Sequence, residues 1–221
     1  MPIYNEELES YIRKIFTTED QVLSQIRDAT PARGLPAISV RPEEGRFLQF
    51  LAATCKAQVA LEIGTLGGYS GVWIARGLAP HGRLITVEKN PQHADVARDH
   101  FRLAGVSEQV EIRIGDAHSL LPMLSDDGPF DMIFVDAEKE GYPDYLEWSL
   151  ANLRPGGVLA AHNVFRHGAI VDTRDRDPST EAIRSFNQRL ADETRLISTI
   201  FPAGDGMAIA VMYGKDQPRE K

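Results

Sequence analysis

Acidic or polar side chains stand where each of five short apolar runs ends. They are Glu62 near the end of the first run, then Glu88, Asp116, Asp136 and the pair His162-Asn163. In open parallel sheets, ligands bind beyond the carboxyl ends of the strands. Strand ends that regularly carry such groups therefore indicate one ligand site, assembled from residues far apart in the chain.

The first run leads into a glycine-rich turn, "LEIGTLGGYSG". Glycines at a strand-to-helix turn allow a ligand to approach the backbone closely. Glu88 ends the next run, where an acidic side chain can hydrogen-bond both hydroxyls of a ribose. The turn and Glu88 together indicate a nucleoside site.

The type of nucleoside follows from the spacing and from the charge near the turn. Gly64-Thr65-Leu66-Gly67-Gly68 lacks the G-x-G-x-x-G spacing that a dinucleotide pyrophosphate requires. The carboxylate of Glu62 would repel a phosphate and attract an ammonium or sulfonium, unless it forms a helix-facing ion pair. Asp116 has two compatible roles, accepting from an adenine amine and capping the next helix. S-adenosylmethionine (SAM) fits this set better than a nicotinamide cofactor, so a dehydrogenase is the less favoured alternative.

These residues require an alternating α/β chain to bring them together. Strand-like runs, nearly continuous in apolar character, are "QVALEI", "RLITVE", "QVEIRI", "DMIFVD" and "GVLAA". Helical patterns near 69–79, 91–104, 117–124 and 142–153 separate them, which is typical of βαβ units and a doubly wound parallel sheet. "TRLISTIF" and "MAIAVMY" are joined only by "PAGDG", which predicts a β-hairpin at the end. We expect an α/β fold with an antiparallel C-terminal hairpin.

The first part of the chain is helical in pattern. Residues 1–56 form an expected N-terminal helical cap, and residues 57–221 an α/β core, within a single domain spanning 1–221. The segment "DTRDRDPST" is predicted to be an exposed loop. A helix is expected from about residue 179, with Ser179 or Thr180 as its cap.

Composition limits the classes of partner. The formal net charge is -8, which argues against nucleic acid or an anionic membrane surface as the main partner. Cys55 is the single cysteine, so an internal disulfide is excluded, and its apolar setting predicts a buried thiol. The start of the chain has no signal-peptide pattern, and no run approaches 18 apolar residues. We expect a cytoplasmic protein.

Five segments resemble those of class I SAM-dependent O-methyltransferases, in the branch of catechol and caffeoyl-CoA O-methyltransferases and their small bacterial relatives. They are "LEIGTLGGYSG", "VEKN", "GDAHSLLP", "FVDAEKEGYPDYLEWSLANLRPGG" and "HNVFRHG", supported by "ISVRPEEGRFL" and "PAGDGMAIA". The resemblance runs from about residue 30 to the C-terminus. It implies a Rossmann-like methyltransferase fold with a seven-stranded sheet, methyl transfer from SAM to a small vicinal-dihydroxy aromatic acceptor, and a homodimer.

The resemblance also implies a role for each matching residue. Glu62, Gly64 and Ser70 would line the methionine end of SAM, Glu88 would hold the ribose, and Asp116 with Ala117 the adenine. Val40 would close over the cofactor. Asp136 would bind a divalent metal and face the cofactor amine, Asn163 would be a second metal ligand, and Lys139 would be the general base.

The chemistry gives these roles a physical reason. Methyl transfer from a sulfonium is an in-line displacement, so the site must align the acceptor oxygen with the methyl group and exclude water. A catechol hydroxyl is weakly acidic, and a metal on both neighbouring oxygens would lower its pKa. Lys139 acts as a base only in its neutral form, which desolvation favours; otherwise it is a solvated lysine. Tyr142 is expected either at the substrate mouth or in the core.

His162 departs from the family pattern, because an aspartate usually precedes the asparagine in the metal-dependent branch. As a ligand, its imidazole would suit manganese or a softer metal better than magnesium. Alternatively the site has lost its metal, and His162 acts with Lys139 as a base or hydrogen-bond partner for a non-catechol acceptor. A third interpretation places His162 inward, satisfied by the loop. Arg166 and His167 either favour an anionic acceptor or belong to a solvated loop.

Overall fold

The computed structural model describes residues 5–17 and 19–213. Three helices come first: α1 (Glu6–Phe16), α2 (Gln21–Ala32) and α3 (Pro42–Thr54). The strands are β1 (Val59–Ile63), β2 (Arg83–Glu88), β3 (Val110–Ile114), β4 (Phe130–Val135), β5 (Leu153–His162), β6 (Leu196–Phe201) and β7 (Met207–Met212). The later helices are α4 (Tyr69–Ala75), α5 (Pro91–Leu103), α6 (Ala117–Leu124), α7 (Tyr142–Asn152) and α8 (Pro178–Asp192). The short helices are η1 (Ser107–Gln109), η2 (Ser125–Asp127), η3 (Lys139–Gly141) and η4 (Arg166–Val171).

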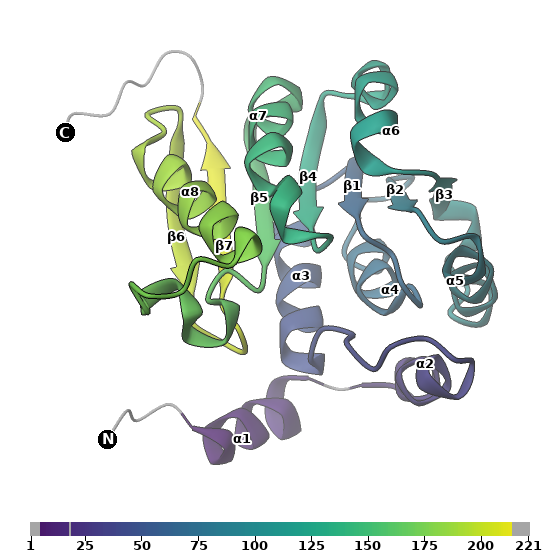
Figure 1. The fold of residues 1–221 in the computed structure, drawn as a ribbon. Coiled ribbons are helices and arrows are strands. Elements are labelled where there is room, and N and C mark those ends of the chain that lie inside the picture. Colours follow the sequence, from purple (N-terminus) through teal and green to yellow (C-terminus); the bar gives the residue numbers. More distant parts are fainter. Residues whose placement is uncertain (1–4, 18, 214–221) are drawn as a thin grey trace.

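The strands form one sheet in the order β3-β2-β1-β4-β5-β7-β6 (Figure 1). Five strands run parallel, and β7 is antiparallel to both of its neighbours, β5 and β6. The predicted α/β fold with a C-terminal hairpin is confirmed. The chain winds outward from β1 on one side and from β4 on the other, so the crevice between these two strands is where such a sheet binds ligands.

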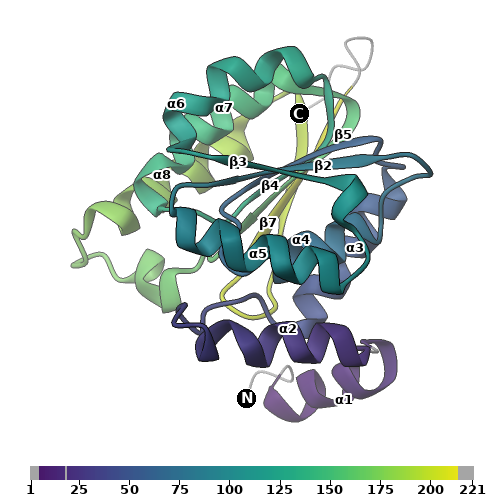
Figure 2. The same cartoon turned by 90° about the vertical axis from the view of Figure 1, so that its right-hand side faces the viewer.

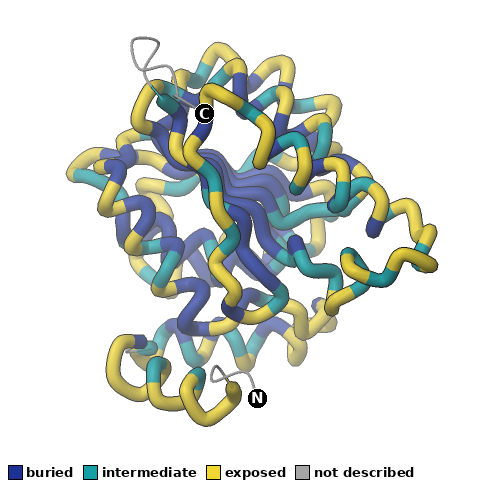
Figure 3. The backbone as a smooth tube through the Cα atoms, turned by 90° about the vertical axis from the view of Figure 1, so that its left-hand side faces the viewer, coloured by how far each residue is buried: buried dark blue, intermediate teal, exposed yellow. Residues whose placement is uncertain are grey.

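Helices cover both faces of the sheet. Figure 2 shows α6, α7 and α8 on one face and α3, α4 and α5 on the other, with α1 and α2 outside the second layer. Each face has its own apolar core. All six residues of β4 are buried, as expected for a central parallel strand covered on both faces, and Figure 3 shows the central strands as the buried middle of the molecule.

Residues 1–56 were expected to form a helical cap. One helix of this segment, α3, packs directly against the sheet. Its buried Leu48 and Ala52 belong to the same apolar core as Phe134 of β4. In the part of the chain that the structure describes, no helix is long and apolar enough to cross a membrane.

The start of α8 corrects one prediction. Its N-cap is Asp177, whose side chain accepts hydrogen bonds from the backbone N–H groups of Ser179 and Thr180, so neither of these two residues is the cap. Pro178 occupies the first helical position, where its missing N–H costs nothing. Thr180 is instead buried.

Candidate active site

One cavity of about 930 Å³ lies at the carboxyl ends of the central strands. Every predicted site residue except Glu62 lines it: Val40, Gly64, Ser70, Glu88, Asp116, Ala117, Asp136, Lys139, His162 and Asn163. Its volume lies in the upper part of the range typical of ligand pockets. The topology therefore brings together residues that the sequence placed at separate strand ends.

The glycine turn after β1 depends on the conformation of Gly64. This residue has φ +99°, and a Cβ atom there would overlap the carbonyl oxygen of Asp136 at the end of β4. The turn and the neighbouring strand end are therefore in direct backbone contact. A side chain at Gly64 would push the two apart.

The amides of this turn are already used within the protein. Oε2 of Glu88 accepts from the backbone N–H of Leu66 at 2.8 Å and of Thr65 at 3.3 Å, and Oε1 accepts from Asn90 at 2.8 Å. A pyrophosphate would meet a carboxylate here instead of free amides, which disfavours a dinucleotide. Glu88 borders the cavity, and beyond these three N–H donors its carboxylate keeps about one lone-pair site, on Oε1, for a hydroxyl donor such as one of a ribose.

Asp116 is the N-cap of α6, where its side chain accepts from the backbone N–H of Ser119 at 3.4 Å. It also lines the cavity together with Ala117. The structural role predicted for Asp116 is thus confirmed, and the position leaves its carboxylate able to accept from a ligand.

Glu62 lies beneath the turn instead of facing the cavity. Its side chain is fully buried and accepts hydrogen bonds from Ser70 Oγ at 2.6 Å and Thr86 Oγ1 at 2.7 Å. Burial raises the pKa of Glu62 to about 7, although both hydroxyls act against that rise. Both hydrogen-bond partners of Glu62 are hydroxyls, so the alternative prediction, an ion pair facing a helix, is wrong. Glu62 holds Ser70, and Ser70 lines the cavity.

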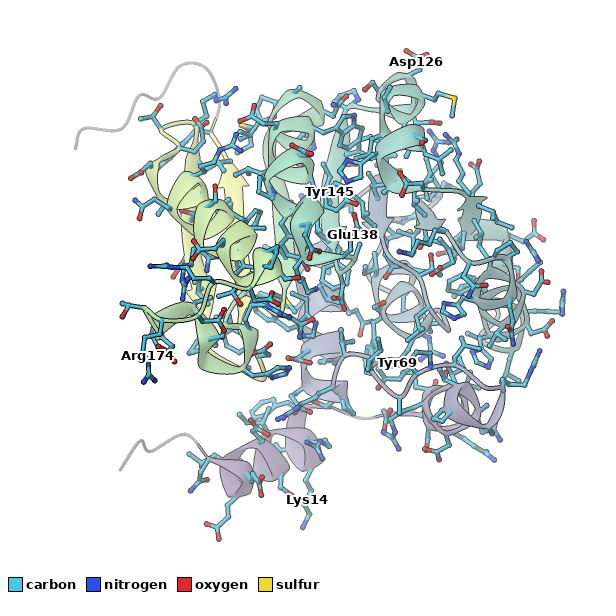
Figure 4. All side chains as sticks on the ribbon, in the orientation of Figure 1. Lys14, Tyr69, Asp126, Glu138, Tyr145 and Arg174 are labelled. Carbon is cyan, nitrogen blue, oxygen red and sulfur yellow. The ribbon has the colours of Figure 1, made fainter. Side chains whose placement is uncertain are left out.

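Lys139 also lines the cavity, and two oxygen atoms hold its ammonium group in place. Its Nζ lies 3.1 Å from Oδ1 of Asp136 and donates to the hydroxyl of Tyr142 at 2.7 Å. Tyr142 is fully buried and donates to the carbonyl of His162 at 2.8 Å, so it is a core tyrosine that positions Lys139. Close by, Tyr145 donates to Glu138, and Figure 4 shows these two side chains beside each other.

His162 is held between two carboxylates. Nδ1 lies 3.2 Å from Oδ2 of Asp136, and Nε2 lies 3.1 Å from Oε1 of Glu44. Burial alone would lower the pKa of His162, but the hydrogen bonds to both carboxylates outweigh it and raise the pKa to about 10. Burial likewise opposes ionisation of Asp136, but the charge of Lys139 and the hydrogen bond from His162 lower its pKa to about 2. At neutral pH the imidazole is therefore a cation that donates from both nitrogens.

A divalent metal does not fit this donor set. A coordinating imidazole must be neutral with a free nitrogen, whereas both nitrogens of His162 are engaged. The oxygens of Asp136 face two cations, Lys139 and His162. Among residues 5–17 and 19–213, no group of three or more His, Cys, Asp or Glu side chains is placed to hold a metal. The metal site predicted from Asp136, His162 and Asn163 is thus not supported.

Glu44 is the site residue that the sequence did not reveal. It lies in the first turn of α3, where its Oε2 accepts from the backbone N–H of Arg41 at 2.7 Å. A glutamate is common at a helix N-terminus, so the capping role explained Glu44 fully. Nothing in the sequence indicated that Glu44 also contacts the site. Its other oxygen meets His162 across 118 residues of sequence.

Comparison with known proteins agrees with this architecture. A family model described as O-methyltransferase matches residues 13–212. A catechol O-methyltransferase of Niastella koreensis is 42% identical over 214 residues, covering 94% of this chain and 97% of that protein. A catechol O-methyltransferase of Mycobacterium tuberculosis is 38% identical, covering 93% and 95%.

Solved structures resemble the whole chain. An O-methyltransferase from Bacillus cereus in complex with SAH has a TM-score of 0.88 at 38% identity, covering 93% of this chain and 97% of that one. One from Streptomyces achromogenes, involved in tomaymycin synthesis and solved with SAM, has a TM-score of 0.88 at 36% identity, covering 94% and 96%. The chain therefore belongs to the O-methyltransferase family and is a SAM-dependent O-methyltransferase.

Proposed function

We propose that this enzyme methylates one hydroxyl of a small vicinal-dihydroxy aromatic acceptor, and that it does so without a divalent metal. Two relatives named catechol O-methyltransferase support the acceptor class. The observation that carries the metal-free chemistry is the imidazole of His162, hydrogen-bonded to Glu44 and Asp136 through both nitrogens.

The cofactor half of the cavity suits a cationic nucleoside. SAM supplies a methyl group on a positively charged sulfur. Glu88 would accept from a ribose hydroxyl, Asp116 and Ala117 would border the adenine, and Asp136 would face the cofactor amine. Ser70, held by Glu62, and Gly64 would border the methionine end, with the buried side chain of Val40 above.

The acceptor half must align an oxygen and remove its proton. In the proposed step, the O–CH₃ bond forms as the S–CH₃ bond breaks, and the bonding pair remains on sulfur. Lys139, which Asp136 and Tyr142 hold in position, accepts the hydroxyl proton once its ammonium group has given up its own proton to solvent. The imidazolium of His162 supplies positive charge beside the developing phenolate. It would thereby stabilise the negative charge that a metal stabilises in metal-dependent enzymes.

Chelation tests the metal-free proposal directly. The enzyme is desalted into buffer with a strong chelator and assayed with catechol and SAM, then again with excess magnesium or manganese. We expect activity in the three conditions to agree within about twofold. Loss of more than tenfold in chelator, restored by manganese, would contradict the metal-free chemistry.

The variant His162→Asp is the matched comparison. It places the aspartate usual in the metal-dependent branch beside Asn163, so we expect its remaining activity to become sensitive to chelator and to be restored by magnesium. Mass spectrometry of the product also decides whether catechol is methylated at all. Titration calorimetry measures the affinity for SAM directly, with NAD as the negative control.

The expected homodimer stays a proposal, supported by an apolar groove between α1, α3 and β6. The groove is lined mainly by Ile12, Phe16, Phe47, Phe50, Phe201 and Ala203. Phe16 and Phe50 are 63% and 60% exposed, so apolar side chains stand open to solvent at this groove. Light scattering should give twice the chain mass, and Phe50→Glu should shift it towards the monomer. A monomeric wild-type protein would contradict the proposal.

A further inference from the structure

The segment after β5 forms one wall of the cavity. Phe165, Arg166, Ile170 and Val171 line it, and Ile38 faces it from the loop before α3. Ile38 and Val171 are 68% and 80% exposed, so apolar side chains stand at the cavity mouth. Such a wall suits the flat face of an aromatic ring, and Arg166 is the charged group within it.

The backbone that carries Arg166 is strained. Asn163, Arg166 and His167 have φ values of +58°, +50° and +52°, a region that residues with a side chain rarely adopt. Contacts with the β6–β7 hairpin hold this conformation: the N–H of Phe165 donates to the carbonyl of Asp205 at 2.9 Å, and the N–H of His167 to its side chain at 2.6 Å. Strain that the surroundings enforce is a feature of ligand sites.

The guanidinium of Arg166 has unused hydrogen-bonding capacity. Its Nε is buried and has no hydrogen-bond partner among the described residues. Its one side-chain acceptor is Asp177, at the outer limit of 3.4 Å, and that carboxylate already caps α8. A guanidinium offers five N–H donors, so even with the Nε donor buried and one donor directed to Asp177, others remain for a ligand.

The other cations around the acceptor end are matched by carboxylates. Lys139 and His162 are paired with Asp136 and Glu44, and Arg41 is paired with Glu9 of α1. Arg166 is paired only with Asp177, at a longer 3.4 Å, and that carboxylate also caps α8, so the charge of Arg166 is the more weakly compensated one in this wall. One weakly compensated positive charge with a planar donor fork matches a carboxylate better than a doubly charged phosphate.

We propose that Arg166 binds a carboxylate carried by the acceptor ring, so that the preferred substrate is an anionic vicinal-dihydroxy aromatic acid. The inference rests on the proposed function and narrows its substrate class. Binding of the carboxylate to the accessible part of the guanidinium would fix the ring with its hydroxyls towards Lys139.

Paired acceptors that differ only in charge test the proposal. Wild type, Arg166→Met and Arg174→Met are assayed with 3,4-dihydroxybenzoate and with its methyl ester. Arg174 is the matched control, because its side chain is 89% exposed, does not line the cavity and points away from the body of the molecule in Figure 4.

For the wild type we expect kcat/KM for the acid to exceed that for the ester by about 10- to 100-fold, mainly through KM. Arg166→Met should bring this ratio close to one, and Arg174→Met should preserve it. Both acceptors are measured on the same preparation, so a loss of folded protein cancels from the ratio.

The alternative outcomes are distinct. Equal or better use of the ester by the wild type, or an unchanged ratio in Arg166→Met, would overturn this inference and leave methylation of dihydroxy aromatics standing. If neither acid, ester nor unsubstituted catechol is methylated, the proposed function fails and the inference fails with it.

Discussion

Replacing Glu44 by glutamine removes one of the two charges that keep His162 protonated while changing the side-chain shape very little. The glutamine oxygen can serve either Arg41 N–H or His162, but not both, whereas the carboxylate accepts from each with a separate oxygen. We therefore expect the pKa of His162 to fall from about 10 towards its ordinary value.

The magnitude follows from linkage between protonation and folding. A rise from 6.5 to about 10 corresponds to roughly 5 kcal/mol of folding free energy, at about 1.4 kcal/mol per pKa unit. Glu44 is one of two partners, so its removal should cost about 2 kcal/mol, taking an equal share for each. Because the folded-state pKa of His162 is raised, this stabilisation is complete below pH 6.5 and disappears as the pH rises through 10.

Urea unfolding at pH 6, 8 and 10.5 measures the effect. Glu44→Gln should cost about 2 kcal/mol at pH 6 and little or nothing at pH 10.5, where a buried carboxylate beside a neutral imidazole is itself unfavourable. Glu43→Gln is the control, because Glu43 is paired with Arg13, whose guanidinium stays charged throughout this range. A cost of Glu44→Gln that is the same at pH 6 and pH 10.5 would refute a charged His162.

Three further substitutions test other parts of the site. Lys139→Met should lower kcat by about 10²- to 10⁴-fold with catechol and by much less with the more acidic 4-nitrocatechol; equal losses would argue against a base. Gly64→Ala should destabilise the fold by more than about 2 kcal/mol. The control is Gly105→Ala: Gly105 has φ +69° and open space around it, so only the smaller backbone strain should appear when urea unfolding midpoints are compared. Glu62→Gln should gain stability relative to wild type as pH rises from 4.5 through 7, by up to roughly 3 kcal/mol, because burial raises the carboxyl pKa to about 7; a pH-independent difference would contradict this.

Local sequence predicted the fold because the elements that matter are locally encoded. Continuous apolar runs marked the central strands, and the run "RLITVE" coincides with β2. The alternation of strands and helices then predicted a doubly wound parallel sheet, while the strand order came only from the structure. The cap of α8 was misplaced since Ser179, Thr180 and Asp177 are all good capping residues, and only the backbone decides which one precedes the helix.

The candidate site was predictable where it depends on strand ends and not where it depends on side-chain direction. Parallel strands place their carboxyl ends at one edge, so Glu88, Asp116 and Asp136 had to meet there. Alternation along β1 decides that Ile63 lines the cavity and Glu62 faces the interior. Glu62 therefore holds Ser70 in place and does not contact the ligand itself. Sequence spacing alone could not distinguish these two roles.

His162, which stands where the family usually has aspartate, and Glu44 have to be considered together, because both set the net charge at the acceptor end of the cavity. Asp136 and Glu44 contribute two negative charges, and Lys139 and His162 contribute two positive ones, so the cluster is neutral as it stands. With aspartate at 162 the same four positions would sum to minus two, which is the charge that a divalent ion neutralises. Bringing such an ion into the neutral cluster would instead leave two uncompensated charges in a largely buried site, at a cost of several kcal/mol. In the proposed mechanism, a protonated histidine takes over the electrostatic role of a metal because two carboxylates, those of Asp136 and the distant Glu44, hold the proton on it.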